Sequence, residues 1–186
     1  ESVYGTTKIM GEKIIADVAK SEFSLKAVVL RYFNPAGAHF SNLIGESSFG
    51  RPVYLVPVIM ETASGKRDEM FVHGIDYETR DGSCIRDFIH IMDLANAHTK
   101  AITYIHNNTS DGDNYEVFNL GAGNGVSILE MINAFEKETE IALNYKIGPR
   151  RSGDVVAIYS NFEKAEQKLG WRPQYDVNDI MRTAWA

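Results

Sequence analysis

The chain has 186 residues, of which 44% are hydrophobic and 24% are charged, and its formal net charge is −6. Its size allows one ordinary domain or two small ones, and its hydrophobic content is that of a packed globular protein. The acidic balance argues against a nucleic-acid partner and an anionic membrane surface, and no apolar run reaches the length of a membrane span.

The predicted elements of the first half are, in chain order, a helix at 6–20, a strand at 27–30, a helix at 54–64, and strands at 69–74 and 84–91. The first helix has an apolar stripe of Met10, Ile14 and Val18, which we expect to pack on a core. The strand at 27–30 is continuously apolar, as is typical of a strand covered on both faces of a parallel sheet. Such sheets bind ligands at the carboxyl ends of their strands, here at RYFNPAG.

The predicted elements of the second half are a helix at 94–107, a strand at 114–123, a helix at 127–138, a strand at 141–148, and helices at 162–170 and 178–185. Asp93 is expected to cap the first of these helices, and Ser127 with Glu130 predicts a capping box. Gly170 is expected to end the helix that precedes it. Strands and helices alternate throughout, which predicts an α/β fold.

The single cysteine, Cys84, excludes an internal disulfide and indicates a reducing, cytoplasmic compartment. The histidines lack metal-ligand spacing, so we expect no metal site. The sequence begins inside a predicted helix without an initiator methionine, which we interpret as a piece of a longer protein.

Tyr4 and Lys8 are four residues apart at the start of this helix, so their side chains are expected to be neighbours. A phenol has a reference pKa of about 10, and a nearby cation favours its ionised form. The spacing therefore fits a tyrosine acid/base. The alternative is a chance pair on a helix surface.

Two arginines from distant segments are candidates for binding an anion. Arg86 lies in a predicted strand, and Arg151 in the basic loop PRRSGD. Paired guanidinium groups are suited to clamp a diphosphate through charge-assisted hydrogen bonds. The structural alternative is that Arg86 pairs with Asp81 or Asp87 at the surface while the arginines of the loop are solvated.

Two further segments have both a binding and a structural interpretation. The Asn34 amide can donate to a phosphate or carbonyl oxygen, or Asn34 can simply start an Asn-Pro turn. The segment NLGAGNG follows a predicted strand, but its match to a dinucleotide fingerprint fails at Val126, and it lies too late to begin a Rossmann unit. We interpret it as a structural turn.

Several segments together resemble one enzyme family. They are YGTTKIMGE, LRYFNPAGAH, GIDYETRDGSCIRDFIHIMDLANAH, NLGAGNGVSILEMINAFEK and PRRSGDVVAIYSN. Their order and spacing resemble those of UDP-glucose 4-epimerases, which are extended short-chain dehydrogenases/reductases that use NAD. The resemblance covers essentially the whole chain and corresponds to the C-terminal half of such an enzyme.

The resemblance implies an activity, a cofactor and catalytic residues. The implied reaction interconverts UDP-glucose and UDP-galactose through a 4-keto intermediate with tightly bound NAD. Tyr4 is then the acid/base at the sugar 4-hydroxyl, and Lys8 favours its phenolate and holds the nicotinamide ribose. Tyr32 and Phe33 match residues near the nicotinamide.

The resemblance also implies a set of substrate-binding residues: Asn34, Tyr54, Leu55, Phe71, Val72, His73, Arg86, Arg151, Asp154 and Ile158. Within it, Arg86, Arg151 and Asn34 anchor the diphosphate, and Asp154 binds the uridine ribose. Val53 and Tyr54 stand where many relatives have two asparagines, and His73 stands where an aromatic ring commonly packs near uracil. Ile158 occupies the position that limits sugar size and favours plain hexoses over N-acetylated ones.

The implied organisation has two parts. Residues 1–36 and about 86–110 form the C-terminal part of an NAD-binding domain whose glycine-rich half is absent, and residues 37–85 and 111–186 form the UDP-sugar-binding domain. Relatives pair as homodimers through the helix that carries Tyr4. The alternatives are another sugar-nucleotide enzyme (a UDP-N-acetylglucosamine 4-epimerase, dehydratase or decarboxylase) and a nucleotide-sugar-binding module without redox chemistry.

Overall fold

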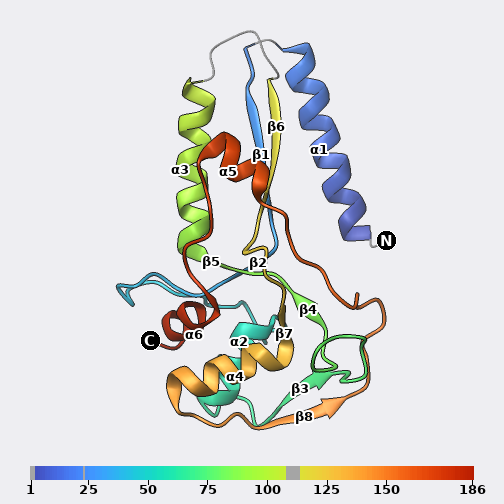
Figure 1. Ribbon diagram of the computed structural model, residues 1–186, viewed down its shortest axis with the longest axis vertical. Helices are drawn as coiled ribbons and strands as arrows, with labels where there is room; N and C mark the ends of the chain where they lie inside the picture. Colours follow the sequence, from blue (N-terminus) through green and yellow to red (C-terminus); the bar gives the residue numbers. More distant parts are fainter. Residues whose placement is uncertain (1–2, 23, 108–113) are drawn as a thin grey trace.

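The structure is a computed structural model that describes residues 3–22, 24–107 and 114–186 (Figure 1). Its helices are α1 (Val3–Ser21), α2 (Leu55–Ala63), α3 (Ile91–Asn107), α4 (Ile128–Thr139), α5 (Glu163–Leu169) and α6 (Val177–Trp185). Its strands are β1 (Ala27–Tyr32), β2 (Asn34–Ala36), β3 (Met70–His73), β4 (Ile85–Arg86), β5 (Phe88–His90), β6 (Tyr115–Leu120), β7 (Val126–Ser127) and β8 (Tyr145–Gly148). The α/β class is confirmed.

The upper part of the molecule in Figure 1 is built on the parallel pair β1 and β6. Helix α1 lies on one side of this pair, and α3 and α5 lie on the other. The core on the second side contains Phe118, Leu120, Leu94 and Trp171, all of them buried. The prediction of a parallel sheet flanked by helices is therefore confirmed.

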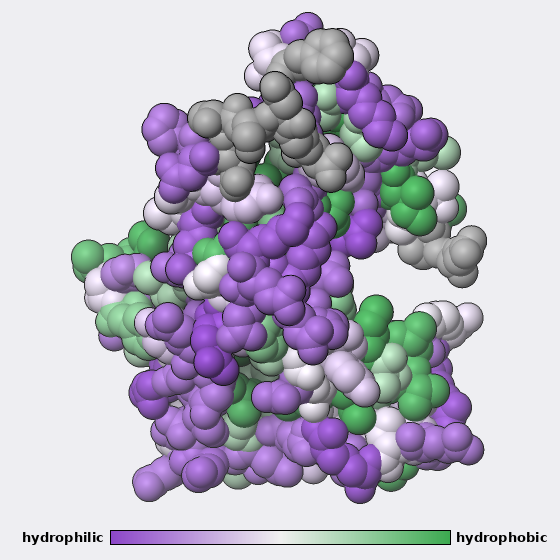
Figure 2. Space-filling model, turned by 45° about the horizontal axis from the view of Figure 1, so that its top comes forward, coloured by the Kyte–Doolittle hydropathy of each residue, from purple (hydrophilic) through white to green (hydrophobic). Residues whose placement is uncertain are grey.

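The apolar stripe of α1 does not pack on a core in this chain. Met10, Ile14 and Val18 are 59%, 62% and 44% exposed, so the expectation that they are buried is wrong. Figure 2 shows hydrophobic surface on the right-hand side, where α1 lies in Figure 1. The helix instead meets the sheet through a face that includes the buried Ala19.

The lower part packs α2, α4 and α6 around a second core, beside the parallel pair β3 and β8 and the antiparallel pair β4 and β7. The upper and lower parts of the structure do not follow the domain boundaries that were expected from the sequence. Strand β6 and helix α5 belong to residues 111–186, yet they pack with β1 and α3 in the upper part. The expected boundary at 110–111 lies outside the described residues.

The strand predicted at 84–91 is broken into β4 and β5 at Asp87. The Asp87 side chain is fully buried and accepts backbone N–H groups from Ala122 (2.6 Å), Gly123 (3.1 Å) and Ser160 (2.8 Å). The glycine-rich segment is thus a turn held by a carboxylate, in agreement with its structural interpretation. At Gly121 a Cβ atom would lie only 2.3 Å from Asp87 Oδ2, so the approach requires glycine.

The predicted helix ends agree with the structure in two cases and not in a third. Ser127 and Glu130 form the capping box, and Gly170 ends α5 with a φ of 60°. Asp93 does not cap α3, which begins at Ile91. Its buried carboxylate accepts the backbone N–H groups of Gln174 and Tyr175 instead, and so ties the segment before α6 to α3. The strand predicted at 141–148 begins only at Tyr145.

Candidate active site

A cavity of about 340 Å³ lies where β3, β4, the start of α2 and the loop before Asp154 meet. It gathers most of the substrate-binding residues predicted from the sequence: Asn34, Tyr54, Leu55, Phe71, His73, Arg86, Arg151 and Asp154. These residues come from segments far apart in the chain. Val53, at a position already noted as a departure from the relatives, also lines the cavity, as do Cys84 and Phe88, for which the sequence predicted no binding role.

Arg86 is the most constrained charged group of the cavity. Its Nη1 donates to the carbonyl oxygens of Ile85 (2.9 Å) and Val155 (2.8 Å), and its Nη2 donates to Asp154 Oδ1 at 3.2 Å. The side chain is only 16% exposed. The alternative that Arg86 pairs with Asp81 or Asp87 at the surface is wrong, because both carboxylates are engaged elsewhere.

The two adjacent arginines of the basic loop have different surroundings. Arg151 lines the cavity together with Arg86. Arg150 instead donates to Asp76 Oδ1 (2.8 Å) and lies over the ring of Tyr77, with 4.2 Å between its Cζ and the ring centroid. The expectation of a two-arginine cavity thus agrees with the arrangement of Arg86 and Arg151.

Asn34 lies in β2 rather than in an Asn-Pro turn, so the turn interpretation is wrong. Its Nδ2 and its backbone N both donate to the carbonyl oxygen of Asp87, at 2.8 Å and 3.0 Å. The amide is therefore held at the edge of the cavity by the same residue that anchors the glycine-rich turn. Asp87 is the organising residue that sequence reasoning missed. Its only signal was a carboxylate inside a predicted strand.

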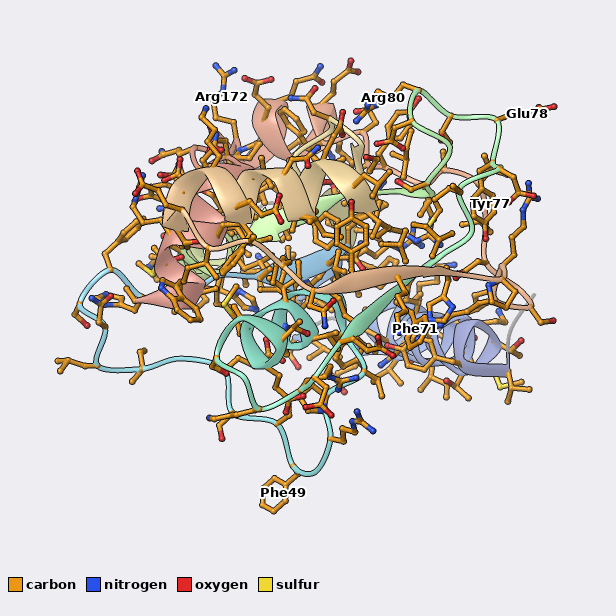
Figure 3. The ribbon with its side chains drawn as sticks, turned by 90° about the horizontal axis from the view of Figure 1, so that it is seen from below. Phe49, Phe71, Tyr77, Glu78, Arg80 and Arg172 are labelled. Carbon is orange, nitrogen blue, oxygen red and sulfur yellow. The ribbon has the colours of Figure 1, made fainter. Side chains whose placement is uncertain are left out.

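The other wall of the cavity is aromatic. Phe71 projects from β3 (Figure 3), and its ring centroid lies 6.3 Å from that of His73. His73 Nδ1 donates to the carbonyl oxygen of Pro149 at 3.3 Å. Side chains alternate across a strand, so the intervening Val72 points into the core and is buried. The Val72 side chain therefore does not line the cavity, and the contact of Val72 with the substrate stays a prediction that its backbone would have to fulfil.

Ile158 does not line this cavity. Its backbone N donates to the carbonyl oxygen of Ile85 at 3.1 Å, which places it beside β4 with an exposed side chain.

Tyr4 and Lys8 are neighbours on α1, as predicted. Lys8 Nζ lies 5.0 Å from the centroid of the Tyr4 ring, and the Tyr4 residue is 70% exposed. Neither residue lines the cavity, because α1 belongs to the upper part of the molecule. At the end of β1, the Tyr32 hydroxyl and His98 Nε2 are 2.6 Å apart, and the backbone N of Phe33 donates to Leu120.

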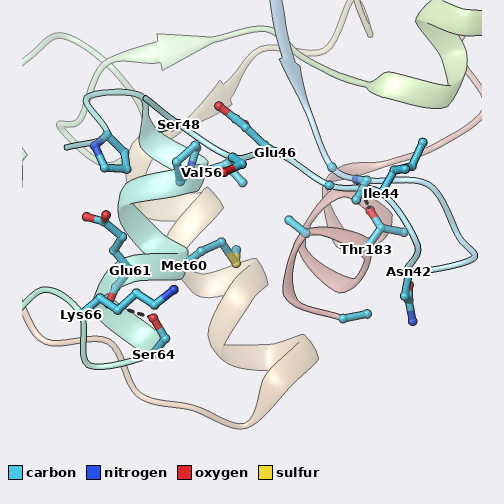
Figure 4. A pocket seen from close by; sticks show the side chains of 18 of the residues that line it. Asn42, Ile44, Glu46, Ser48, Val56, Met60, Glu61, Ser64, Lys66 and Thr183 are labelled. Carbon is cyan, nitrogen blue, oxygen red and sulfur yellow. Dashed lines mark hydrogen bonds between the residues drawn. The ribbon is translucent and has the colours of Figure 1, made fainter. Parts of the chain in front are cut away.

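Two other cavities are lined in part by α2, and one of them adjoins the first. One of about 650 Å³ shares Asn34, Tyr54 and Leu55 with it. The other, of about 410 Å³, lies between α2, α6 and the segment 42–50, and Figure 4 shows Glu61 and Lys66 on its wall. Glu46 lines both, and burial raises the pKa of its carboxyl.

Within the described residues, no helix has the length and apolar character needed to cross a membrane. The same part of the chain holds no group of three or more histidine, cysteine or acidic side chains arranged to bind a metal ion.

Comparisons with known proteins agree with the fold. Residues 1–184 match the family model described as GDP-mannose 4,6 dehydratase. The chain is 43% identical over 184 residues to a UDP-glucose 4-epimerase of Erwinia amylovora, and the match covers 99% of this chain and 53% of that protein.

The chain is also similar to solved structures of UDP-glucose 4-epimerases. A UDP-glucose 4-epimerase from Stenotrophomonas maltophila, with bound NAD and formylated UDP-arabinopyranose, is 40% identical with a TM-score of 0.93, covering 100% of this chain and 54% of that one. A UDP-glucose 4-epimerase from Bifidobacterium longum, in complex with NAD+ and UDP, is 42% identical with a TM-score of 0.89, covering 98% and 53%.

The chain spans about half the length of the relatives it matches. The alignments confirm the expected α/β fold of extended short-chain dehydrogenases/reductases. Because the family model matches almost every residue, the chain belongs to the GDP-mannose 4,6 dehydratase family of proteins, within which it is similar to UDP-glucose 4-epimerases.

Proposed function

We propose that this chain is the C-terminal half of an NAD-dependent UDP-glucose 4-epimerase, which interconverts UDP-glucose and UDP-galactose in galactose metabolism. The observation that carries the proposal is the cavity, which gathers two arginines, an aspartate and a fixed asparagine amide beside an aromatic wall. These groups match the parts of a nucleoside diphosphate. The epimerase names of the relatives support the same activity.

Epimerisation requires a sugar that is free to turn and a nucleotide that is not. Arg86 is held on three sides and lies beside Arg151, so a diphosphate is bound there by groups that are already in place. Asp154 offers a carboxylate to ribose hydroxyls, and Phe71 and His73 offer ring faces to the uracil. The 4-keto sugar then rotates about its diphosphate.

The exposed pair on α1 carries the proton chemistry in this proposal. Tyr4 takes the proton of the sugar 4-hydroxyl and returns it, and the ammonium group of Lys8 favours the phenolate because it is a cation one turn away. Both side chains are open to a ligand, and Tyr32 and Phe33 lie where parallel strands end, so these residues fit the nicotinamide end of NAD. When bound, NAD supplies the acceptor and donor of the sugar hydride.

The same proposal also covers the domain boundaries, the oligomeric state, the location in the cell and the sugar preference. Residues 1–36 and about 86–110, together with β6 and α5, complete the NAD-binding domain, and the rest of residues 37–85 and 111–186 binds the UDP-sugar. The exposed apolar side chains of α1, among them Ile9, Met10 and Ile14, support a homodimer formed through this helix. The protein is cytoplasmic, and Ile158 favours plain over N-acetylated hexoses.

The test uses a protein of the relatives' length that contains this chain, purified and assayed with UDP-glucose, UDP-galactose and their N-acetylated forms. Interconversion of glucose and galactose, with the absorbance of bound NAD, is the expected result. A second candidate, a sugar-nucleotide 4,6-dehydratase, is favoured by the description of the family model, and a 4-keto-6-deoxy product would establish it. Binding of UDP-sugars without turnover or bound NAD would identify a non-redox binding module.

A further inference from the structure

Tyr77 carries an unusual polar group beside the proposed nucleotide site. It lies in the loop between β3 and β4, in the motif GIDYETRDGS, and only 5% of its surface is exposed. Among the described residues, its buried hydroxyl has no hydrogen-bond partner. Buried hydroxyls are almost always paired because an unpaired one loses its hydration without compensation. The position of this phenol therefore requires an explanation.

The Tyr77 ring is held on two sides. The guanidinium group of Arg150 lies 4.2 Å from its centroid and is itself tied to Asp76. On another side the ring packs against Gly74, where a Cβ atom would lie only 2.7 Å from Tyr77 Cε2. The backbone N of Tyr77 donates to Gly82 at 2.9 Å, which closes the loop. Figure 3 shows the residue on this loop, next to the strand that carries Phe71. The phenol is thus fixed in place.

Besides Arg150, the groups that act electrostatically on this phenol belong to the cavity wall. They include Asp154, Cys84 and Arg86, each of which lines the cavity. Burial, followed by the negative charge of Asp154, raises the pKa of Tyr77, so its hydroxyl keeps its proton and remains a donor. Tyr77 therefore carries a buried, unpaired donor that interacts electrostatically with the Asp154 carboxylate.

Asp154 has only one of its oxygens committed to the cavity wall. Oδ1 accepts from Arg86, whose guanidinium is anchored on two carbonyl oxygens. The carboxylate has further lone pairs, and it is partly exposed to the cavity. A second donor to this carboxylate would fix its plane, so that its remaining lone pairs point at a diol in the cavity.

We propose that Tyr77 is a positioning residue of the nucleotide site, whose hydroxyl donates to Asp154, directly or through one water molecule, when a nucleoside diphosphate is bound. The inference rests on the proposed function, since it names how the same site recognises the ribose. Tyr77 acts through Asp154 and does not touch the reacting atoms.

The test is Tyr77→Phe, which removes the hydroxyl and keeps the ring. UDP binding by the full-length protein is measured by calorimetry, and the melting temperature is measured without ligand. We expect UDP to bind about tenfold more weakly, the scale of one hydrogen bond to a charged group. The melting temperature is expected to stay the same or rise, because the removed hydroxyl has no partner in the described structure. If Tyr77 served only to stabilise the fold, Tyr77→Phe would lower the melting temperature and would not weaken UDP binding selectively.

The route through Asp154 is tested in the Asp154→Ala background, where Tyr77→Phe is expected to have no further effect on UDP affinity. Tyr104→Phe, on α3 and outside the cavity, is the matched control and should bind UDP normally. Unchanged UDP affinity in Tyr77→Phe, or an equal loss in both backgrounds, would overturn the inference alone. Failure of the unaltered protein to bind UDP would reject the proposed function and the inference with it.

Discussion

The guanidinium group of Arg86 and the carboxylate of Asp154 lie 3.2 Å apart, although 68 residues separate them in the chain. This contact joins β4 to the basic loop and forms the charged wall of the cavity. Because two backbone carbonyls also hold the guanidinium, its orientation is set before a ligand arrives. Such preorganisation lowers the cost of ordering the site on binding.

Arg86→Ala should weaken UDP binding by about 1–3 kcal/mol, because a charged hydrogen bond is lost and Asp154 loses its partner. Calorimetric titration with UDP measures the change. Arg172→Ala is the control, since Arg172 is an exposed residue outside the cavity that pairs with Glu166 at 3.8 Å. Equal UDP affinity in the wild type and Arg86→Ala would show that Arg86 is not part of the binding site.

Tyr4→Phe should lower kcat by about 10²–10⁴-fold, the usual contribution of a general acid/base. UDP affinity should be unchanged, because Tyr4 does not line the nucleotide cavity. Steady-state kinetics with UDP-galactose, combined with UDP titration, separates the two effects. Tyr145→Phe, on β8, serves as the control and should keep full activity. A Tyr4→Phe enzyme with wild-type turnover would reject Tyr4 as the base.

Asp87→Ala should lower the free energy of unfolding by about 3 kcal/mol or more, because the backbone N–H groups of Ala122, Gly123 and Ser160 lose their acceptor. Urea denaturation followed by circular dichroism measures the change. Asp17→Asn, on the exposed face of α1, should change stability by less than about 0.5 kcal/mol. A similar small effect at Asp87 would contradict its role as an anchor.

His90 should make stability depend on pH. Its Nδ1 accepts the backbone N–H of Met92, so the proton lies on Nε2, which is 3.0 Å from Thr183 Oγ1. Burial lowers the pKa of His90 below its ordinary value of 6.5. The unfolded chain therefore binds more protons than the folded one just below pH 6.5. Stability contributed by the neutral ring is present above that pH and is lost as the pH falls towards the lowered value.

Thermal unfolding between pH 7.5 and 5 measures this loss. His90→Gln should be less stable at neutral pH and should show a flatter pH profile over the same range. His106→Gln, at the exposed end of α3, should keep the wild-type profile. If wild type and His90→Gln had the same slope, the pH dependence would have to come from other groups.

The local features were the most predictable from the sequence. Helical spacing placed Lys8 beside Tyr4, and the chemistry of Ser127 and Glu130 predicted a capping box that the structure contains. These features depend on contacts within one or two turns of helix, which neighbouring residues determine. The stripe through Met10 failed as a prediction because periodicity shows that a face is apolar and does not show what covers it.

The α/β alternation, the tyrosine and lysine pair, and the residue types suited to a nucleotide could all be read from the sequence, because each depends on composition or short spacing. The pairing of Arg86 with Asp154 rather than with Asp81 or Asp87 depends on how the chain packs, and so does the hold of the Asp87 carboxylate on two distant segments, the turn at Ala122 and Gly123 and the backbone at Ser160. A long-range pair forms between whichever groups the packed chain brings together. Residues next to each other in a strand point to opposite faces, so nearness in sequence does not make a contact.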